Sequence, residues 1–413
     1  MKKIKALIVA GGLPQITLID ELKKRNIHTV LVDGSEKAIA RKYADTFYCA
    51  QIFDIEAVKD IAEKEQVDFL ITVCADQVLL VVAQVAEMLG LPWYIDYETA
   101  KNVSDKELMK EVFVKNGVPT SRHMVMSELD TDKIKDLEYP LVVKPVDAYS
   151  SKGVRKVTNE DELKEAFVDA ANISRNKNVI VEEFCEGEEY SVDVFVSGGK
   201  AHVLCVSNSE KVKDEGKFVI FRGKFPGNVG AEVMDIIRDT AQKIADAFGL
   251  VNSPMLIQLI SDGKKISVLE FCARTGGAMK FLLIKRACGF DVINAVIDLT
   301  LGNEVKVELK EPENKYIVNN FIYCNRGEFS HIEGFDELMA EGIITDYRLL
   351  RAPGTLMFGN VNSSSDRIGG FTVQADSVEE FNRKLRTAVE RMKIIDTDGN
   401  DIMRHDLFTD LSE

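Results

Sequence analysis

The chain has 413 residues, a formal net charge of -15 and a pI near 5.0. Its acidic residues are spread through amphipathic segments, which argues against a nucleic-acid-binding surface and a patch for anionic membranes, so any phosphate site must be local. At about 150 residues per domain, the length predicts two to four domains. The apolar region Phe69–Ile95 is interrupted by polar residues and is not expected to span a membrane. The seven cysteines form neither a CxxC pair nor a zinc spacing, so we expect reduced thiols in a cytoplasmic protein.

Short apolar runs alternate with amphipathic helices in the first hundred residues. The predicted segments are strands at Ile4–Ala10, Thr29–Asp33 and Phe69–Val73 and helices near 15–26, 54–65 and 77–89. This alternation predicts right-handed βαβ units and a parallel sheet. The strands end at Gly11-Gly12, Asp33-Gly34 and Cys74–Asp76, on the edge where open α/β sheets bind ligands. Gly11-Gly12 is not a full GxGxxG motif, so a tight turn and a substrate site both stay open.

A helix is predicted to begin at Ser104. Ser104 and Glu107 have the spacing of a capping box, and Gly117 ends the helix before Val118-Pro119. Lys106 therefore falls in the first turn, where the helix dipole disfavours a cation. A bound anion would remove that conflict, and a solvated lysine is the alternative interpretation.

Two further strand pairs carry polar residues at their ends. The strand Pro140–Lys144 is followed by the loop Tyr149–Gly153, whose small residues free backbone N–H groups to fold over phosphates. The strand Val179–Cys185 runs into the acidic turn Glu186–Glu189. Its carboxylates can bind ribose hydroxyls and its backbone can read an adenine edge, while a solvated acidic turn is the alternative.

The segment Gln258–Gly277 predicts a hairpin with charged groups at its mouth. Two apolar strands flank Asp262-Gly263, and the second ends at Glu270, four residues before Arg274. A carboxylate is a hard oxygen ligand for Mg²⁺, and an arginine can steady a transferring phosphoryl oxygen. Taken alone, an ordinary surface hairpin is an equally good interpretation.

Other elements complete the pattern. They are strands at Ala201–Ser207 and Phe218–Arg222, a helix near 231–248, a helix after Gly276-Gly277, a helix at Asp291–Leu301, strands near 316–324 and 369–374, and a helix near 377–393.

Five separated segments fall in the order and spacing of one family. They are Lys106, Lys144, the Ser150–Gly153 loop, the Glu182–Glu189 region and the Gln258–Gly277 hairpin. Together they resemble an ATP-grasp enzyme over residues 1 to 305. The resemblance implies a multidomain α/β and α+β fold. Its parts are an N-terminal parallel α/β pre-ATP-grasp domain (1–103), a central and lid subdomain (104–185), a large subdomain with the metal hairpin (186–310) and a small C-terminal α+β subdomain (311–413).

The resemblance also assigns a nucleotide site. The residues implied to contact ATP are Lys106, Lys144, Ser150, Ser151, Gly153, Glu182, Glu183, Phe184, Cys185 and Glu189. The two lysines would bind the phosphates, and the serines and the glycine would form a loop that closes over them. The next four residues match the adenine hinge, and Glu189 matches the ribose carboxylate.

At the metal hairpin the chain departs from the family pattern. The family has an acidic residue, a glutamate, an asparagine and an arginine where this chain has Gln258, Glu270, Cys272 and Arg274. A neutral amide oxygen can still bind Mg²⁺, whereas a thiol is too soft. We therefore expect Mg²⁺ (or Mn²⁺) at Glu270 and a second ion held loosely by Gln258, ATP and water. Cys272 is interpreted as a small hydrophobic side chain, and Arg274 as the catalytic residue that stabilises charge on the acyl phosphate.

The activity implied by the resemblance is that of an ATP-dependent carboxylate-amine ligase. ATP and a carboxylate give an acyl phosphate and ADP, and an amine then attacks. The layout is similar to that of L-amino-acid ligases. The alternatives are a purine-pathway or carbamoyl-phosphate-synthetase-like enzyme, or an ATP-binding protein that has lost catalysis. The expected partners are small carboxylates and amines, with neither nucleic acid nor membrane, and a homodimer is left open.

Overall fold

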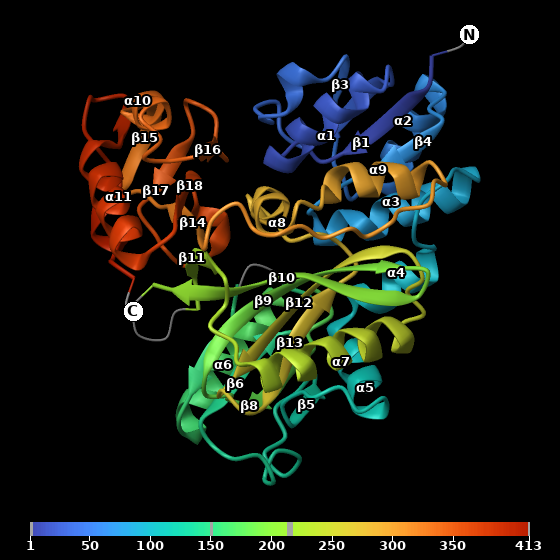
Figure 1. The fold of residues 1–413 in the computed structure, drawn as a ribbon. Coiled ribbons are helices and arrows are strands. Elements are labelled where there is room, and N and C mark those ends of the chain that lie inside the picture. The colour runs from blue at the N-terminus through green and yellow to red at the C-terminus, as the bar shows by residue number, and fades with distance from the viewer. Residues whose placement is uncertain (1–2, 149–151, 213–217, 412–413) are drawn as a thin grey trace.

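The computed structural model describes residues 3–148, 152–212 and 218–411. Figure 1 shows an N-terminal domain in blue, a central part rich in strands, and a C-terminal part in red. Helices α8 (Lys280–Cys288) and α9 (Val292–Thr300) lie between these parts. Within the described ranges, none of the helices combines the length and the apolar character needed to cross a bilayer.

The N-terminal domain contains the predicted parallel sheet. Its strands are β1 (Lys5–Val9), β2 (His28–Asp33), β3 (Thr46–Cys49) and β4 (Phe69–Ile71), in the order β3-β2-β1-β4. The helices beside it are α1 (Leu13–Lys24), α2 (Ile55–Glu65) and α3 (Asp76–Leu89), with the short 3₁₀ helix η1 (Arg41–Tyr43). Strand β3 was not predicted; it is only four residues long, lies at the sheet edge and contains no buried residue.

The N-cap of the helix with Lys106 lies one residue later than predicted. Helix α4 (Tyr97–Ser104) ends at Ser104, whose hydroxyl donates to the carbonyl of Ala100 at 2.7 Å. Asp105 caps helix α5 (Lys106–Lys115) by accepting from the backbone N–H groups of Glu107 and Leu108. The predicted capping box at Ser104 is therefore wrong, because the neighbouring aspartate takes the N-cap position. Lys106 does lie in the first turn, as predicted.

A four-stranded antiparallel sheet follows. Its strands are β5 (His123–Met126), β6 (Leu141–Pro145), β7 (Arg155–Val157) and β8 (Val179–Glu183), in the order β5-β8-β6-β7, with α6 (Glu160–Ile173) packed on it. Strands β6 and β7 form the predicted hairpin, with Leu141 opposite Val157. Part of its loop, residues 149–151, lies outside the described residues.

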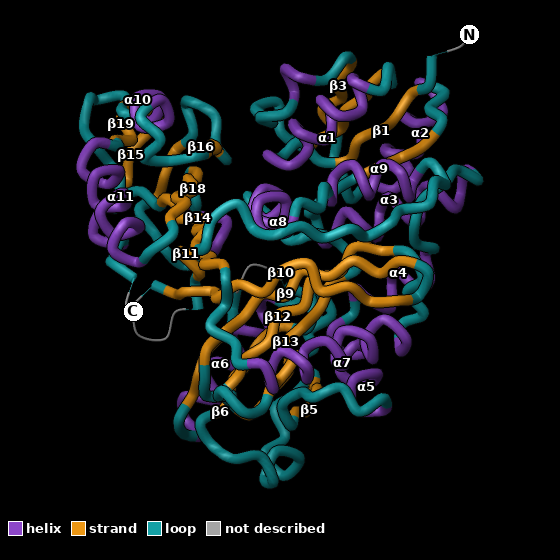
Figure 2. The backbone as a smooth tube through the Cα atoms, in the orientation of Figure 1, coloured by secondary structure: helices purple, strands orange, loops and turns teal. Residues whose placement is uncertain are grey.

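The largest sheet has eight antiparallel strands in the order β13-β12-β9-β10-β11-β14-β18-β16. They are β9 (Glu188–Ser197), β10 (Lys200–Lys211), β11 (Ile220–Phe225), β12 (Ser253–Ser261), β13 (Ile266–Cys272), β14 (Tyr316–Ile322), β16 (Asp346–Leu349) and β18 (Gly369–Ala375). Helix α7 (Ala231–Ala247) packs against this sheet. The pairing of β11 with β14 carries the sheet from the central part into the C-terminal part, as the strands in Figure 2 show.

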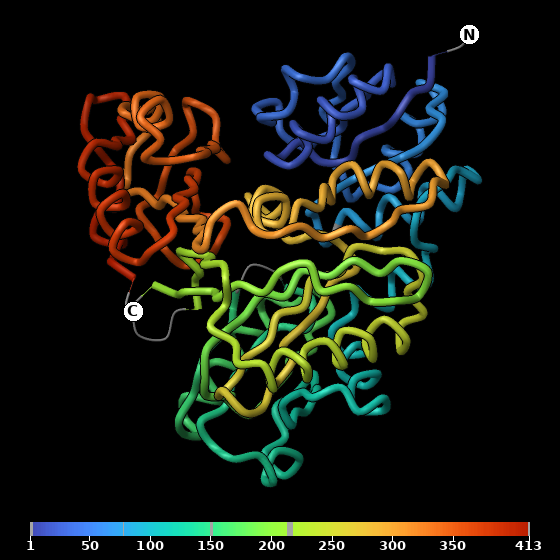
Figure 3. Tube along the Cα trace, viewed as in Figure 1, coloured from blue at the N-terminus to red at the C-terminus, as the bar shows by residue number. Residues whose placement is uncertain are grey.

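The C-terminal part adds a three-stranded sheet and two helices. These elements are β15 (Arg326–Glu333), β17 (Leu356–Phe358), β19 (Lys393–Asp396), α10 (Phe335–Ala340) and α11 (Val378–Arg391), with the 3₁₀ turns η2 (Ser364–Asp366) and η3 (His405–Leu407). Figure 3 shows the segment after α9 running back along α8 before β14 begins. The backbone N–H of Lys310 donates to the carbonyl of Cys288 at 2.8 Å, which fixes this path.

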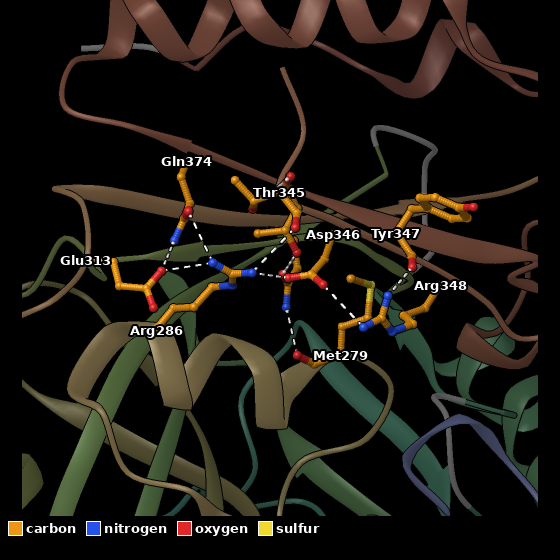
Figure 4. A network of polar contacts seen from close by, with 10 residues as sticks. Met279, Arg286, Glu313, Thr345, Asp346, Tyr347, Arg348 and Gln374 are labelled. Carbon is orange, nitrogen blue, oxygen red and sulfur yellow. Dashed lines mark hydrogen bonds and ion pairs between the residues drawn. The ribbon is translucent and has the colours of Figure 1, made fainter. Parts of the chain in front are cut away.

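Arg286 at the end of α8 joins the central and C-terminal parts (Figure 4). Its guanidinium contacts Glu313 at 2.8 Å and is also paired with Asp346. It donates to Gln374 at 3.3 Å, and Arg348 lies 3.3 Å from the second oxygen of Asp346. Because both carboxylates and the amide of Gln374 meet one guanidinium, the strands of the C-terminal part are fixed relative to α8.

Candidate active site

A cleft of about 650 Å³ lies where the three parts meet. The N-terminal domain contributes Gly12–Gln15 and Cys74–Asp76, which follow strands β1 and β4 as the parallel sheet predicts. The central part contributes Lys106 and the mouth of the β12–β13 hairpin, and the C-terminal part contributes Arg351 and Arg367.

Lys106 and Glu270 form the first ion pair of the cleft. The Lys106 ammonium lies 2.9 Å from Oε2 of Glu270 and donates to the carbonyl of Ala148 at 2.8 Å. Burial works against both charges, but each partner's charge outweighs it. The pKa of Lys106 is therefore raised and that of Glu270 lowered. With side-chain exposures of 23% and 32%, both groups remain accessible to a ligand.

Gln258 lies opposite Glu270 in the ladder between β12 and β13. Both side chains line the cleft, and the amide nitrogen of Gln258 donates to Glu189 at 3.4 Å. No group of three or more His, Cys, Asp or Glu side chains able to hold a metal occurs in the described part of the chain. Glu270 and Gln258 thus offer a carboxylate and an amide oxygen, which fits Mg²⁺ that keeps water and phosphate oxygens as its other ligands.

The Cys272 thiol also lines the cleft, between Glu270 and Arg274 on the chain. Burial, followed by the charge of Asp76, raises its pKa well above the ordinary value. The side chain is therefore a neutral thiol rather than a thiolate at physiological pH, and a neutral thiol is a poor ligand for a hard cation.

Arg274 connects the hairpin to the N-terminal domain. It is paired with Asp76, the first residue of α3, and donates to the carbonyl of Thr275 at 2.7 Å. Burial opposes the charge of Arg274, but Asp76 outweighs it, so the pKa of Arg274 is raised. In addition, the Tyr94 hydroxyl donates to the carbonyl of Ala273 at 2.9 Å. These contacts hold the guanidinium in the cleft wall.

Lys144 lies in a second, buried charge cluster. Its ammonium is 2.5 Å from Oε1 of Glu182, and the ammonium of Lys110 is 2.8 Å from Oε2. Ser121 also donates to Glu182, at 2.7 Å. Burial opposes ionisation of Glu182, but the two lysines outweigh it and lower its pKa far below the ordinary value. Lys110 was not singled out from the sequence, although its position four residues after Lys106 places both lysines on one helix face.

The residues assigned to the adenine hinge do not line the cleft. Glu183 is 3.3 Å from Arg122, and the Lys156 ammonium lies 3.8 Å from the ring centre of Phe184. Cys185 is half-buried. The Glu182 carboxylate, assigned to the same hinge, faces the lysines instead of open space, so only backbone groups of this segment remain to meet a base.

The last assigned nucleotide residues lie at two further places. Glu189 is 2.6 Å from Lys211, on the far side of Gln258 from Glu270. Gly153 has φ +76, and a Cβ there would lie 2.7 Å from Ile173 Cδ1, so the position requires glycine. Ser150 and Ser151 lie outside the described residues.

Comparison with known proteins agrees with this architecture. Residues 137–281 match the family model of the ATP-grasp domain. The chain is 24% identical over 406 residues to formate-dependent phosphoribosylglycinamide formyltransferase of Methanocaldococcus jannaschii. The alignment covers 95% of this chain and 97% of the relative.

Two solved structures illustrate the similarity of fold. An L-amino acid ligase from Bacillus licheniformis superposes with a TM-score of 0.76 at 21% identity, covering 96% of this chain and 100% of that one. The biotin carboxylase domain of Hydrogenobacter thermophilus 2-oxoglutarate carboxylase gives a TM-score of 0.78 at 17% identity, covering 97% and 92%. The predicted ATP-grasp fold is confirmed, and residues 137–281 of the chain match the ATP-grasp domain.

Proposed function

We propose that this protein is an ATP-dependent ligase that activates a carboxylate as an acyl phosphate and joins it to an amine. The observation that carries the proposal is the convergence of Lys106, Glu270 and Arg274 in one cleft between three parts of the chain. A phosphate-binding cation, a metal-binding carboxylate and a fixed guanidinium are the groups that phosphoryl transfer requires. The similarity to an L-amino acid ligase supports the same reaction class.

In this proposal Lys106 and Lys144 bind the phosphates of ATP, and each must leave a carboxylate to do so. Glu270 would hold Mg²⁺ and leave Lys106 free for a phosphate, and Lys144 would leave Glu182, which keeps Lys110 as its partner. When bound, Mg²⁺ neutralises phosphate charge. The binding of Mg-ATP thus exchanges ion pairs within the protein for ion pairs with the ligand, which limits the desolvation cost.

The chemistry then follows from the charges. A carboxylate oxygen of the substrate attacks the γ-phosphorus of ATP and ADP leaves. The amine attacks the acyl carbon, inorganic phosphate leaves, and the amine nitrogen loses a proton. Arg274 is assigned the role of stabilising negative charge in both steps. A covalent protein nucleophile is not needed, and the cleft thiols are poorly suited to be one, since burial raises the pKa of Cys74 to about 12.

Turnover with defined substrates tests the proposal. Purified protein is incubated with Mg-ATP and a matrix of carboxylates and amines, and ADP and phosphate are measured. The matrix includes pairs of amino acids. It also includes formate with phosphoribosylglycinamide, because the name of one relative that aligns over nearly its whole length contains both compounds. Stimulation of ADP release by one carboxylate and amine pair is expected. If ATP binds but no pair stimulates ADP release, the ligase proposal is wrong.

A second candidate function is ATP binding without catalysis. It is supported by Gln258 and Cys272, which occupy positions where the family has metal ligands. The variant Gln258→Glu separates the two. If the protein binds ATP without turnover and Gln258→Glu restores Mg²⁺-dependent ADP release, the natural chain is a binding protein. If the natural chain turns over, the second candidate is excluded.

A further inference from the structure

The cations that line the cleft fall into two groups. Lys106, Arg274 and Lys280 are each paired with a carboxylate of the protein. Arg351 and Arg367 line the same cleft, and neither is paired with a carboxylate anywhere in the ranges that the structure describes. A guanidinium is always charged at neutral pH, and a buried charge is costly unless an opposite charge meets it. The C-terminal wall of the cleft therefore carries positive charge that the protein itself leaves unmatched.

Arg367 is the more deeply placed of the two, with only 9% of its surface exposed. Its Nε donates to the Tyr323 hydroxyl at 3.0 Å, and its Nη2 donates to the carbonyl of Ile220 at 2.6 Å. The guanidinium carbon lies 3.7 Å from the ring centre of Phe321, which also lines the cleft. These contacts fix the guanidinium plane, whereas Nη1 has no hydrogen-bond partner in the described part of the chain.

The nearest carboxylate in sequence is committed elsewhere. Asp366 accepts from the backbone N–H groups of Asn362 and Ser363, at 2.9 and 3.0 Å, and so caps the turn η2. Arg351 donates to the carbonyl of Ser365 in this turn. The turn thus binds Arg351 at Ser365, two residues before Arg367, both arginines line the cleft, and the carboxylate of the turn accepts from its own backbone. Two guanidiniums at one turn, with neutral protein partners only, are suited to bind an oxyanion.

We propose that Arg351 and Arg367 bind a second anionic group, a carboxylate or a phosphate, on the substrate whose reacting carboxylate lies near Arg274. This inference rests on the proposed ligase function. It assigns the carboxylate substrate to the class of molecules with two acidic groups, one for Arg274 and one for the arginines of the C-terminal wall. A substrate with a single acidic group would leave the positive charge of the C-terminal wall unmatched.

Anion titration by calorimetry tests the subsite without any turnover. The full chain is saturated with a non-hydrolysable Mg-ATP analogue, which occupies the nucleotide phosphate site, and is then titrated with inorganic phosphate and, separately, with succinate. We expect binding of at least one anion, and about tenfold or more weakening in Arg351→Gln and Arg367→Gln, as loss of a charge-assisted hydrogen bond predicts. The preferred anion identifies the source, phosphate or carboxylate.

Two controls separate the subsite from structural effects. Arg386→Gln removes an exposed arginine of the same part that is paired with Asp410, and should leave anion affinity unchanged. Arg367→Lys keeps the charge and should retain more of the affinity than Arg367→Gln. The inference is wrong if neither phosphate nor succinate binds. It is also wrong if Arg351→Gln and Arg367→Gln bind both anions with the affinity of the natural chain. It is also wrong if both variants lose affinity for the ATP analogue to the same extent as for the anions.

Turnover provides an independent readout once a substrate is found. Arg351→Gln should raise KM for a substrate with two acidic groups by about tenfold or more and change kcat little, since the contact is to a non-reacting group. A substrate with one acidic group should show no such rise. If no carboxylate stimulates ADP release, the ligase proposal fails, while the titration still decides whether Arg351 and Arg367 bind an anion.

Discussion

The ammonium nitrogen of Lys106 lies 2.9 Å from Oε2 of Glu270, so the lysine proposed for ATP phosphates neutralises the carboxylate proposed for the metal. The pair spans two elements, the first turn of α5 and the end of β13. Because each charge compensates the other, neither phosphate nor Mg²⁺ alone gains its full attraction. When phosphate and Mg²⁺ bind together, Lys106 can pair with the phosphate and Glu270 with the metal. We therefore expect metal and nucleotide to bind cooperatively.

The variant Glu270→Gln tests this exchange. It removes the metal-binding carboxylate and frees Lys106, so metal-free ATP should bind at least as tightly as it binds the natural chain. With Mg²⁺ present, ATP affinity should fall by about tenfold or more relative to the natural chain, the effect of one lost charged contact. A fluorescent ATP analogue titrated with EDTA and then with Mg²⁺ measures both. Glu341→Gln, outside the cleft and paired with Arg391 in the natural chain, is the matched control, and an equal Mg²⁺ effect in both variants would contradict the proposed metal site.

Lys110→Met tests the buried charge cluster through stability. Lys110 and Glu182 have side-chain exposures of 2% and 3%, and the variant leaves Glu182 with Lys144 as its single cationic partner. Removing one partner of a buried ion pair costs about 3 kcal/mol of unfolding free energy, which urea denaturation measures. Lys164→Met removes an exposed partner of Glu160 and should change the free energy of unfolding much less than Lys110→Met does. A loss of similar size in both variants would show that the cluster does not stabilise the fold.

The fold was more predictable from the sequence than the site. The β12–β13 hairpin and the N-terminal sheet have local signals, namely apolar runs and turns. The edge strand β3 has no buried residue, and its four residues are too short a run to stand out. The direction of the Glu182 side chain depends on Lys110 from α5 and Lys144 from the neighbouring strand, contacts that form only when distant segments pack. Likewise, Arg367 reaches the cleft because β11, β14 and β18 are adjacent in one sheet, which no local pattern specifies.

The pH dependence of the free energy of unfolding should reveal the lowered pKa of Glu182. Its pKa lies below the ordinary value of 4.5 in the folded chain, since the charges of Lys144 and Lys110 outweigh burial. The unfolded state therefore binds the proton more readily, and the stabilisation by Glu182 is present above the unfolded pKa and is lost as the pH falls below it. Between about pH 5 and pH 3, the natural chain should lose stability more steeply than Glu182→Gln. Urea unfolding across this range measures the slopes, and parallel slopes would exclude the assigned role.

Variants of Lys144 and Arg274 should affect ATP binding and ADP release differently. Lys144→Ala removes a proposed phosphate contact, so ATP affinity should fall about tenfold or more, as expected for one charged hydrogen bond. Arg274→Ala should leave ATP affinity close to that of the natural chain but abolish ADP release, because its guanidinium is proposed to act on charge that develops during transfer. Asp76→Asn keeps Arg274 and removes its partner, so it should lower kcat less than Arg274→Ala does. If Arg274→Ala lowered ATP affinity as much as Lys144→Ala, Arg274 would be a nucleotide-binding residue, and the acyl phosphate would need another source of positive charge.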